Sequence, residues 1–160
     1  MKKNNLLEPK AFSNYYDGNP RILMTKVGFK STMTNNKNKE IVCDGIWDTG
    51  ATSTAISSEI VKQCKLIPIG KATVHTAGGQ VSQNVYLVDV TLPNNVTIKS
   101  LRVTEIPAIN GANALIGMDI MSLGDMALTH KNNKTIFTFK IPASEEIDFT
   151  QSIQEETIKE

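Results

Sequence analysis

Short apolar stretches separated by clusters of Asn, Gly and Pro run along most of this 160-residue sequence. The stretches contain many Val, Ile and Thr residues, which favour β-strands. Asn, Gly and Pro favour the tight turns that join strands. Short strands at regular spacing are typical of closed or sandwiched β architectures. The sequence therefore predicts a mostly β fold with one or two short helices.

The expected strands cover residues 21–29, 40–47, 71–75, 81–92, 101–106, 126–130 and 135–141. Ser57 precedes a stretch with the character of a helix N-terminus, and a second short helix is expected at 118–123. Three regions follow from this pattern: an N-terminal arm or irregular lead-in at 1–20, one domain at 21–142, and an acidic tail at 143–160.

Composition restricts the partners that can be expected. Hydrophobic residues make up 40% and charged residues 21%, with a net charge of +1, which is ordinary for a soluble globular protein. This charge gives no electrostatic reason to expect nucleic acid or a membrane surface as partner, and no apolar run approaches the length of a membrane span. The first ten residues hold lysines without an apolar segment, so we expect no secretory signal and a cytoplasmic protein with Cys43 and Cys64 reduced.

The segment Ile46–Ser53 carries the chemistry-bearing residues. An apolar strand runs directly into Asp48-Thr49-Gly50, so the Asp48 carboxylate is expected at the end of a rigid element and partly shielded from water. Gly50 allows a tight turn and the close approach of another backbone. Asp48 is therefore the candidate catalytic residue.

A single carboxylate is a poor acid–base catalyst, because it cannot accept one proton and donate another at the same time. Two carboxylates in contact share one proton, so one member accepts a proton while the other donates one. The sequence contains one Asp-Thr-Gly. The second carboxylate is therefore expected from a second copy of the chain across a two-fold axis.

The sequence resembles the retropepsin family of aspartic peptidases over roughly residues 21–141. The resemblance is based on three features in order: Asp48-Thr49-Gly50-Ala51, the Gly-bearing hairpin tip Ala77-Gly78-Gly79, and the apolar run Ala114-Leu115-Ile116-Gly117 with a short helix after it. It implies a closed, mostly β barrel that is active as a homodimer and hydrolyses peptide or protein substrates without a cofactor.

The resemblance also implies roles for individual residues. Asp48 would be catalytic, and Thr49, Gly50 and Ala51 would support the active-site loop. A flap would contact the substrate through Thr76, Ala77, Gly78 and Gly79. The active-site loop would be held in place by Leu115, Ile116 and Gly117. Thr52 and Met118 occupy positions where retroviral members commonly carry an acid and an Arg, so the chain looks more like cellular or bacterial members.

Other interpretations stay open at this level. A non-catalytic, dimeric peptide-binding module on the same fold is the main alternative. Asp119 is expected to be structural, as a residue at a helix start, and Trp47 is expected in the core. The cysteines and His75 and His130 match no zinc-binding spacing, so no metal is expected.

Overall fold

The computed structural model describes residues 8–33, 39–76, 79–107, 111–151 and 153. The strands are β1 (Lys10–Asp17), β2 (Met24–Ser31), β3 (Ile41–Trp47), β4 (Ala55–Ser57), β5 (Gly70–Thr76), β6 (Gly79–Thr91), β7 (Thr97–Ile106), β8 (Ala114–Ile116), β9 (Asp125–Lys131) and β10 (Lys134–Ile141), and the helices are α1 (Ser58–Gln63) and α2 (Met118–Met121). The predicted mostly β fold with short helices is confirmed.

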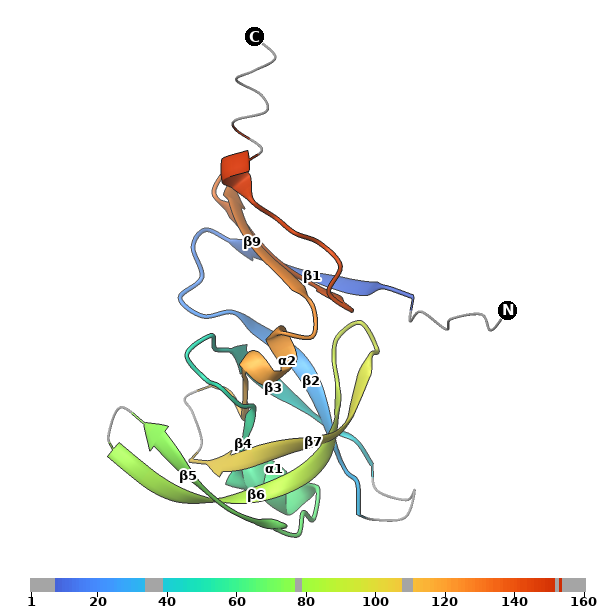
Figure 1. Cartoon of the computed structure of the whole chain (residues 1–160), viewed down its shortest axis with the longest axis vertical. Helices are drawn as coiled ribbons and strands as arrows, with labels where there is room; N and C mark the ends of the chain where they lie inside the picture. Colours follow the sequence, from blue (N-terminus) through green and yellow to red (C-terminus); the bar gives the residue numbers. More distant parts are fainter. Residues whose placement is uncertain (1–7, 34–38, 77–78, 108–110, 152, 154–160) are drawn as a thin grey trace.

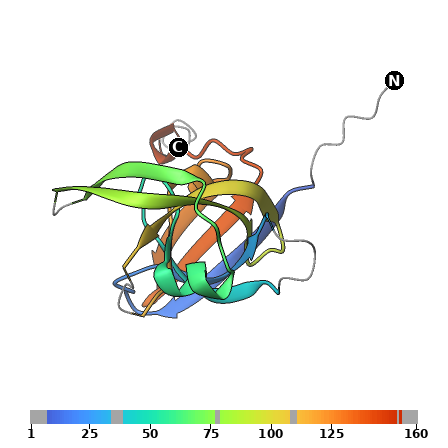
Figure 2. The same cartoon turned by 90° about the horizontal axis from the view of Figure 1, so that it is seen from below.

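The larger sheet closes on itself. Its strand order is β2-β3-β8-β4-β7-β6-β5, and β2 also pairs with β6, which joins the two sides into a barrel. Strand β5 lies outside this ring and pairs with the first half of β6, so these two strands form a hairpin that projects from the barrel (Figures 1 and 2). The expected closed barrel is therefore present.

The barrel interior is filled by alternate residues of its strands. Val27 and Phe29 of β2, Val88 and Val90 of β6, and Val103 of β7 are almost completely buried. Their spacing of two residues is the strand periodicity, which directs alternate side chains to one face. Apolar burial of this kind is the main favourable contribution to folding.

A second sheet, with strand order β1-β10-β9, lies above the barrel (Figure 1). An aromatic cluster joins the two sheets: Phe12 of β1, Phe137 and Phe139 of β10, and Trp47 of β3. Their ring centroids are separated by 5.0–6.1 Å, which is the range of favourable aromatic pairs. Trp47 is thus a core residue, as expected, and its indole N–H donates to Thr25 Oγ1 at 2.9 Å.

Strand β1 differs from the irregular lead-in expected for residues 1–20. Residues Lys10–Asp17 pair along their whole length with β10. Phe12, Asn14 and Tyr16 alternate with exposed residues, and only two of these three are aromatic. The local alternation is therefore too weak to indicate a strand. The strand is stabilised by a partner more than a hundred residues away in sequence, which no local pattern reveals.

The helices begin where the sequence indicates. The Ser57 hydroxyl accepts from the backbone N–H of Ile60 and caps α1, as predicted. Helix α2 ends at Met121, two residues earlier than expected. Strand β7 is continuous from Thr97 to Ile106, whereas the sequence predicted two separate pieces, a hairpin arm at 96–98 and a strand at 101–106. In the part of the chain that the structure describes, no helix is long and apolar enough to cross a membrane.

Candidate active site

Asp48 directly follows the last residue of β3. Strands β3 and β8 run parallel, with Trp47 opposite Ile116. The Asp48 N–H continues this ladder by donating to the Ile116 carbonyl at 3.0 Å, and the Ala51 N–H donates to the Asp48 carbonyl at 3.1 Å to close a turn. Asp48 is therefore fixed by backbone hydrogen bonds on both sides of its Cα.

The Asp48 carboxylate is oriented by its own loop. The Gly50 N–H donates to Asp48 Oδ1 at 2.9 Å. A Cβ atom at Gly50 would lie 3.1 Å from the same oxygen, so a side chain there would crowd the carboxylate. Asp48 is half-buried, while Thr49 and Gly50 are exposed. The carboxylate is thus held in one direction and remains accessible.

The start of α2 holds the loop that follows Asp48. The Met118 N–H donates to the Ala51 carbonyl at 2.8 Å, and the Asp119 N–H donates to the Thr52 carbonyl at 3.2 Å. Gly117 packs so closely that an added Cβ would lie 2.6 Å from the backbone carbon of Ser53. Only glycine permits this approach. The structure therefore brings Ile116 and Gly117 against the loop.

A buried polar contact completes this connection, and sequence reasoning missed it. The Thr54 N–H and hydroxyl donate to the two oxygens of Asp119 at 2.9 and 2.7 Å. The Gly117 N–H in turn donates to Thr54 Oγ1 at 3.2 Å. Asp119 is structural, as expected, but its partner is Thr54 across the loop as well as its own helix. The loop and α2 are thereby joined by hydrogen bonds. Thr52 and Met118, which stand where retroviral members commonly carry an acid and an Arg, form no ion pair here.

A cleft of about 540 Å³ opens beside Asp48. Its floor consists of the active-site loop and Leu115, and its walls come from the β5–β6 hairpin and β7. The lining residues are Asp48, Gly50, Ala51, Thr52, Ser53, Ala55, Ala72, Thr73, Val74, Gln83, Thr104, Ile106 and Leu115. Asp48 is the one charged residue among them. Apart from Asp48 the lining side chains are uncharged and mostly small, which leaves room for an extended chain.

The expected flap coincides with the β5–β6 hairpin. Thr76 pairs with Gly79 at its end, and Gly79 has a φ of +115°, which favours glycine strongly. Ala77 and Gly78 lie outside the described residues, so their predicted contact with substrate stays a prediction. The hairpin base, in contrast, directly lines the cleft through Ala72 and Gln83.

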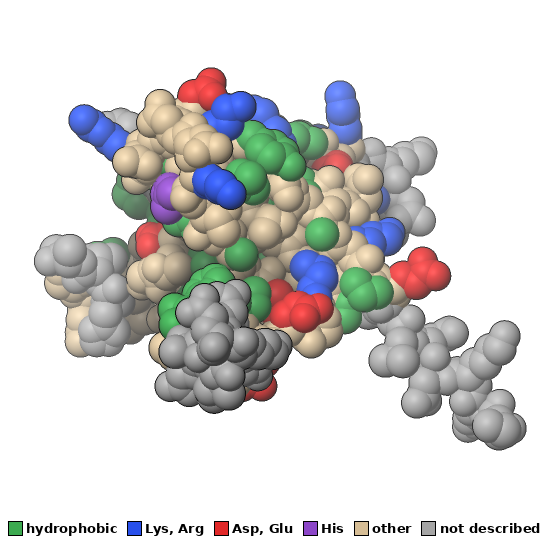
Figure 3. Space-filling view, turned by 90° about the horizontal axis from the view of Figure 1, so that it is seen from above, with side chains coloured by type: hydrophobic (Ala, Val, Ile, Leu, Met, Phe, Trp, Pro, Cys, Tyr) green, Lys and Arg blue, Asp and Glu red, His purple; other side chains and the backbone are tan. Residues whose placement is uncertain are grey.

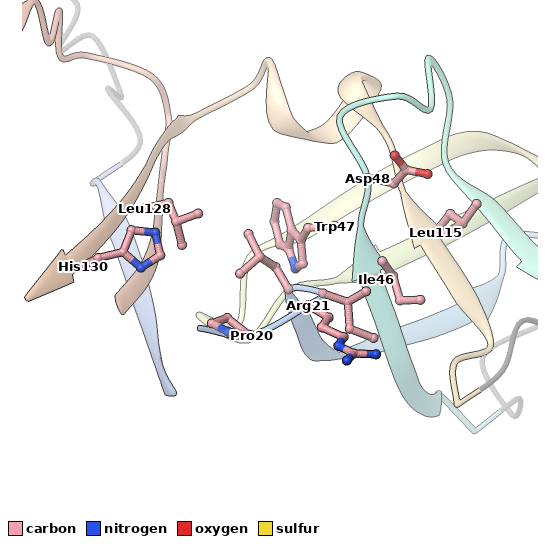
Figure 4. A pocket seen from close by; sticks show the side chains of 10 residues that line it. Pro20, Arg21, Ile46, Trp47, Asp48, Leu115, Leu128 and His130 are labelled. Carbon is pink, nitrogen blue, oxygen red and sulfur yellow. The ribbon is translucent and has the colours of Figure 1, made fainter. Parts of the chain in front are cut away.

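Asp48 also lines a second hollow, of about 700 Å³, on its other side. The barrel contributes Trp47, Ile46 and Leu115, and the segment before β2 contributes residues 20–23. Leu128 and His130 of β9 face Trp47 from the opposite side (Figure 4). Ile22 and Leu128 are each 46% exposed, so the rim of this hollow presents apolar side chains to solvent. We refer to it as the β9 hollow.

A hydrogen-bonded carboxylate lies at the base of the hairpin. Glu105 of β7 accepts from the hydroxyls of Ser58 at 2.6 Å and Tyr86 at 2.7 Å, and from the Asn84 amide at 3.3 Å. The Ser58 and Tyr86 hydrogen bonds lower the pKa of Glu105. Burial and the bond to Glu105 raise the pKa of Tyr86. These bonds connect α1, β6 and β7 behind the cleft.

The lowered pKa of Glu105 predicts a pH-dependent contribution to stability. Because the folded-state pKa lies below the unfolded one, the contribution is fully present above about pH 4.3 and is lost as the pH falls through the folded value. Glu105→Gln is expected to lower the free energy of unfolding by roughly 1 kcal/mol at pH 7. Urea unfolding of both proteins at pH 7, 5 and 3 should show the difference shrinking toward zero at pH 3. A difference independent of pH would contradict this prediction.

The other ionisable candidates do not gather into a metal site. Among the described residues, no three His, Cys, Asp or Glu side chains lie close enough to hold a metal ion. Cys43 and Cys64 are free and buried. Burial raises the pKa of Cys43 to about 12 and that of Cys64 to about 11, so both are neutral thiols near pH 7.

The fold and the Asp-Thr-Gly loop are those of a retropepsin-like aspartic protease. A family model described as gag-polyprotein putative aspartyl protease matches residues 35–123, more than half of the chain. The chain therefore belongs to this aspartyl protease family. Among curated protein sequences, none matches.

Solved structures with the same fold include a retropepsin-like aspartic protease from Rickettsia conorii. That structure is 15% identical, with a TM-score of 0.52, and the match covers 83% of this chain and 95% of the other. Weaker similarity extends to the EIAV protease in complex with an inhibitor (20% identity, TM-score 0.46, covering 63% and 86%). The retroviral protease-like domain of Ddi1 from Leishmania major is also similar (17% identity, TM-score 0.40, covering 71% and 93%).

Proposed function

We propose that the protein is an aspartic endopeptidase whose active site forms between two copies of the chain, each contributing Asp48. One observation carries this proposal: the Asp48 carboxylate, oriented by the Gly50 N–H, lines a neutral cleft beneath the β5–β6 hairpin. Membership of an aspartyl protease family supports the same reaction.

The need for a second copy follows from the cleft itself. Asp48 is the one carboxylate among the described residues that line it, and aspartic peptidase chemistry needs two carboxylates that share a proton. A two-fold axis beside Asp48 would bring a second Asp48 into contact with the first. The exposed Thr49 would then lie at the interface and stabilise the paired loops.

The paired carboxylates would supply both the base and the acid. The ionised Asp48 removes a proton from a water molecule, whose oxygen attacks the peptide carbonyl carbon, while the protonated Asp48 gives its proton to the carbonyl oxygen. The product of this step is a neutral tetrahedral diol. It collapses when one hydroxyl returns a proton to a carboxylate and the amide nitrogen receives a proton, which breaks the C–N bond.

The shape of the cleft favours an extended peptide. The β5–β6 hairpin forms one wall, and its strands offer backbone groups with which an extended chain can form hydrogen bonds. Small lining residues such as Ala51, Ala55 and Ala72 leave space for substrate side chains. We therefore propose peptide or protein substrates bound in extended form.

The second copy of the chain would bind at the β9 hollow. It adjoins Asp48 on the side away from the cleft, and its rim exposes Ile22 and Leu128. Strand β9 pairs with β10 alone within the described residues, so its other edge is open to pairing with another chain. Viewed from above the three-stranded sheet, the surface exposes hydrophobic side chains among Lys and Arg (Figure 3).

Leu128→Asp is expected to abolish dimerisation. The substitution places a charge in the proposed interface, where an unpaired buried charge is unfavourable by several kcal/mol. The dissociation constant of the dimer should therefore be at least about 100-fold higher for the variant than for the wild type. Light scattering after size exclusion, with and without a transition-state-type peptide inhibitor, measures this, and cleavage activity should fall in parallel.

Ile67→Asp provides the matched control. Ile67 is also an exposed aliphatic residue, at 62%, and it lines neither the cleft nor the β9 hollow. This variant should dimerise as the wild type does and retain its melting temperature, whereas Leu128→Asp should lose only the part of the melting temperature that depends on protein concentration. A wild-type chain that stays monomeric even with the inhibitor, or equal dimerisation of the Leu128 variant, would contradict the proposed interface.

A further inference from the structure

Gln83 on β6 carries a buried polar atom without a partner. Within the described part of the chain, its Oε1 is the single buried side-chain nitrogen or oxygen atom that has no hydrogen-bond partner. Buried polar groups in folded proteins are nearly always hydrogen-bonded, because desolvation without a partner is unfavourable. An exception at this position therefore calls for a functional reason.

The position of Gln83 links it to the cleft. Gln83 pairs with Ala72 across the β5–β6 hairpin, and both residues line the cleft that contains Asp48. Thr104 of β7 lines the same region. Beside the small Ala72 side chain, Gln83 contributes an amide to this wall, together with the hydroxyls of Thr73 and Thr104. Because Oε1 itself is shielded from solvent, a substrate side chain that enters here bonds to it once the amide turns toward the cleft, and no described protein group competes for it.

The charge of the surroundings restricts which side chain fits. Among the described residues that line the cleft, Asp48 is the one that carries a charge. A second hollow on the far side of Gln83 is lined by Lys71 and Glu105, but both Glu105 oxygens already accept hydrogen bonds from Ser58 and Tyr86. Gln83 itself is uncharged, and burying a cationic side chain against an uncharged amide is unfavourable.

We propose that Gln83 determines substrate specificity, by accepting a hydrogen bond from a neutral substrate side chain that carries an N–H or O–H donor, namely Asn, Gln, Ser or Thr. This inference rests on the proposed peptidase function and deepens it. A neutral hydrogen bond that satisfies a buried acceptor is expected to favour such substrates about tenfold in kcat/KM over apolar side chains of the same size.

Cleavage profiling of a randomised peptide library tests the proposal. The wild type should show one position near the scissile bond at which Asn, Gln, Ser and Thr are enriched about tenfold over Leu, Met and Val. Gln83→Met, which keeps the shape and removes the amide, should lose the enrichment at that position alone. Gln63→Met, on α1 away from the cleft, should keep the wild-type profile. Identical profiles for the wild type and Gln83→Met would overturn the proposal.

Two further measurements separate this inference from the proposed function. If the wild type cleaves no peptide, the peptidase function fails, and binding of the same library to the Asp48→Asn chain then decides the role of Gln83. Binding without a preference for donor side chains, or no binding, overturns it. Thermal unfolding is the second measurement: Gln83→Met should melt no lower than the wild type, because the lost acceptor had no partner in the protein. A marked decrease would show that Gln83 is structural and would also overturn the proposal.

Discussion

Asp48→Asn is expected to reduce peptide cleavage by on the order of 10³-fold or more. An amide cannot remove a proton from water, and it cannot share a proton with the second Asp48. The measurement is the rate of cleavage of a mixed peptide pool between about pH 4 and 7, where one carboxylate of a coupled pair can remain protonated. Both proteins should bind the same peptides, since the change keeps the size of the side chain.

The fold should survive this substitution. Asp48 receives one side-chain hydrogen bond, from the Gly50 N–H, and the carboxamide oxygen of Asn can accept the same bond. The melting temperature should therefore stay close to that of the wild type. Equal cleavage by both proteins, or no cleavage by the wild type at any pH, would instead favour a non-catalytic peptide-binding module.

Mixing the two chains tests whether the active site is shared. Exchange between wild-type and Asp48→Asn dimers produces mixed dimers that contain one aspartate. If both carboxylates are needed, adding an equal amount of variant to a fixed amount of wild type should decrease the activity by about half at random pairing. Unchanged or increased activity after complete subunit exchange would show that a single Asp48 suffices.

The sequence predicted the parts of the site that are contiguous along the chain. Asp48-Thr49-Gly50 sits at a strand end because an apolar strand precedes it, and this order is visible in the sequence. The run Ala114–Gly117 is likewise contiguous, so its apolar residues and terminal glycine are visible in the sequence. Strand β8 consists of three residues, yet its parallel pairing with β3 puts Ile116 next to Asp48.

Contacts between distant residues escaped prediction. Thr54 and Asp119 are separated by 65 positions, and neither residue type is unusual at a strand start or a helix start. Gln83 looks like an ordinary polar residue in a strand, and only the folded β5–β6 hairpin reveals that its Oε1 atom is buried. Strand β1 likewise is identified only by its pairing with β10 in the folded structure. Local patterns carry no information on such partners, because tertiary contacts decide them.

Asp119→Ala is expected to destabilise the fold by about 3 kcal/mol, because it leaves buried hydrogen-bond donors without an acceptor. Thr54 is fully buried, and both its N–H and its hydroxyl donate to the Asp119 carboxylate. The hydroxyl also accepts from the Gly117 N–H, so the change disturbs the contact between α2 and the active-site loop. Urea unfolding at pH 7 measures the loss of stability.

The same substitution should also impair activity at temperatures where the protein stays folded. Residues 51–54 connect Asp48 to β4, and a displacement of about 1 Å in a catalytic group can reduce the rate by about 100-fold. Asp119→Asn, which keeps one acceptor oxygen, should have an intermediate effect on both stability and rate. Asp44→Ala is the control, because Asp44 forms an exposed ion pair with Lys26 that contributes at most about 1 kcal/mol. If Asp119→Ala were no more harmful than Asp44→Ala, the Thr54–Asp119 contact would not be what holds the active-site loop.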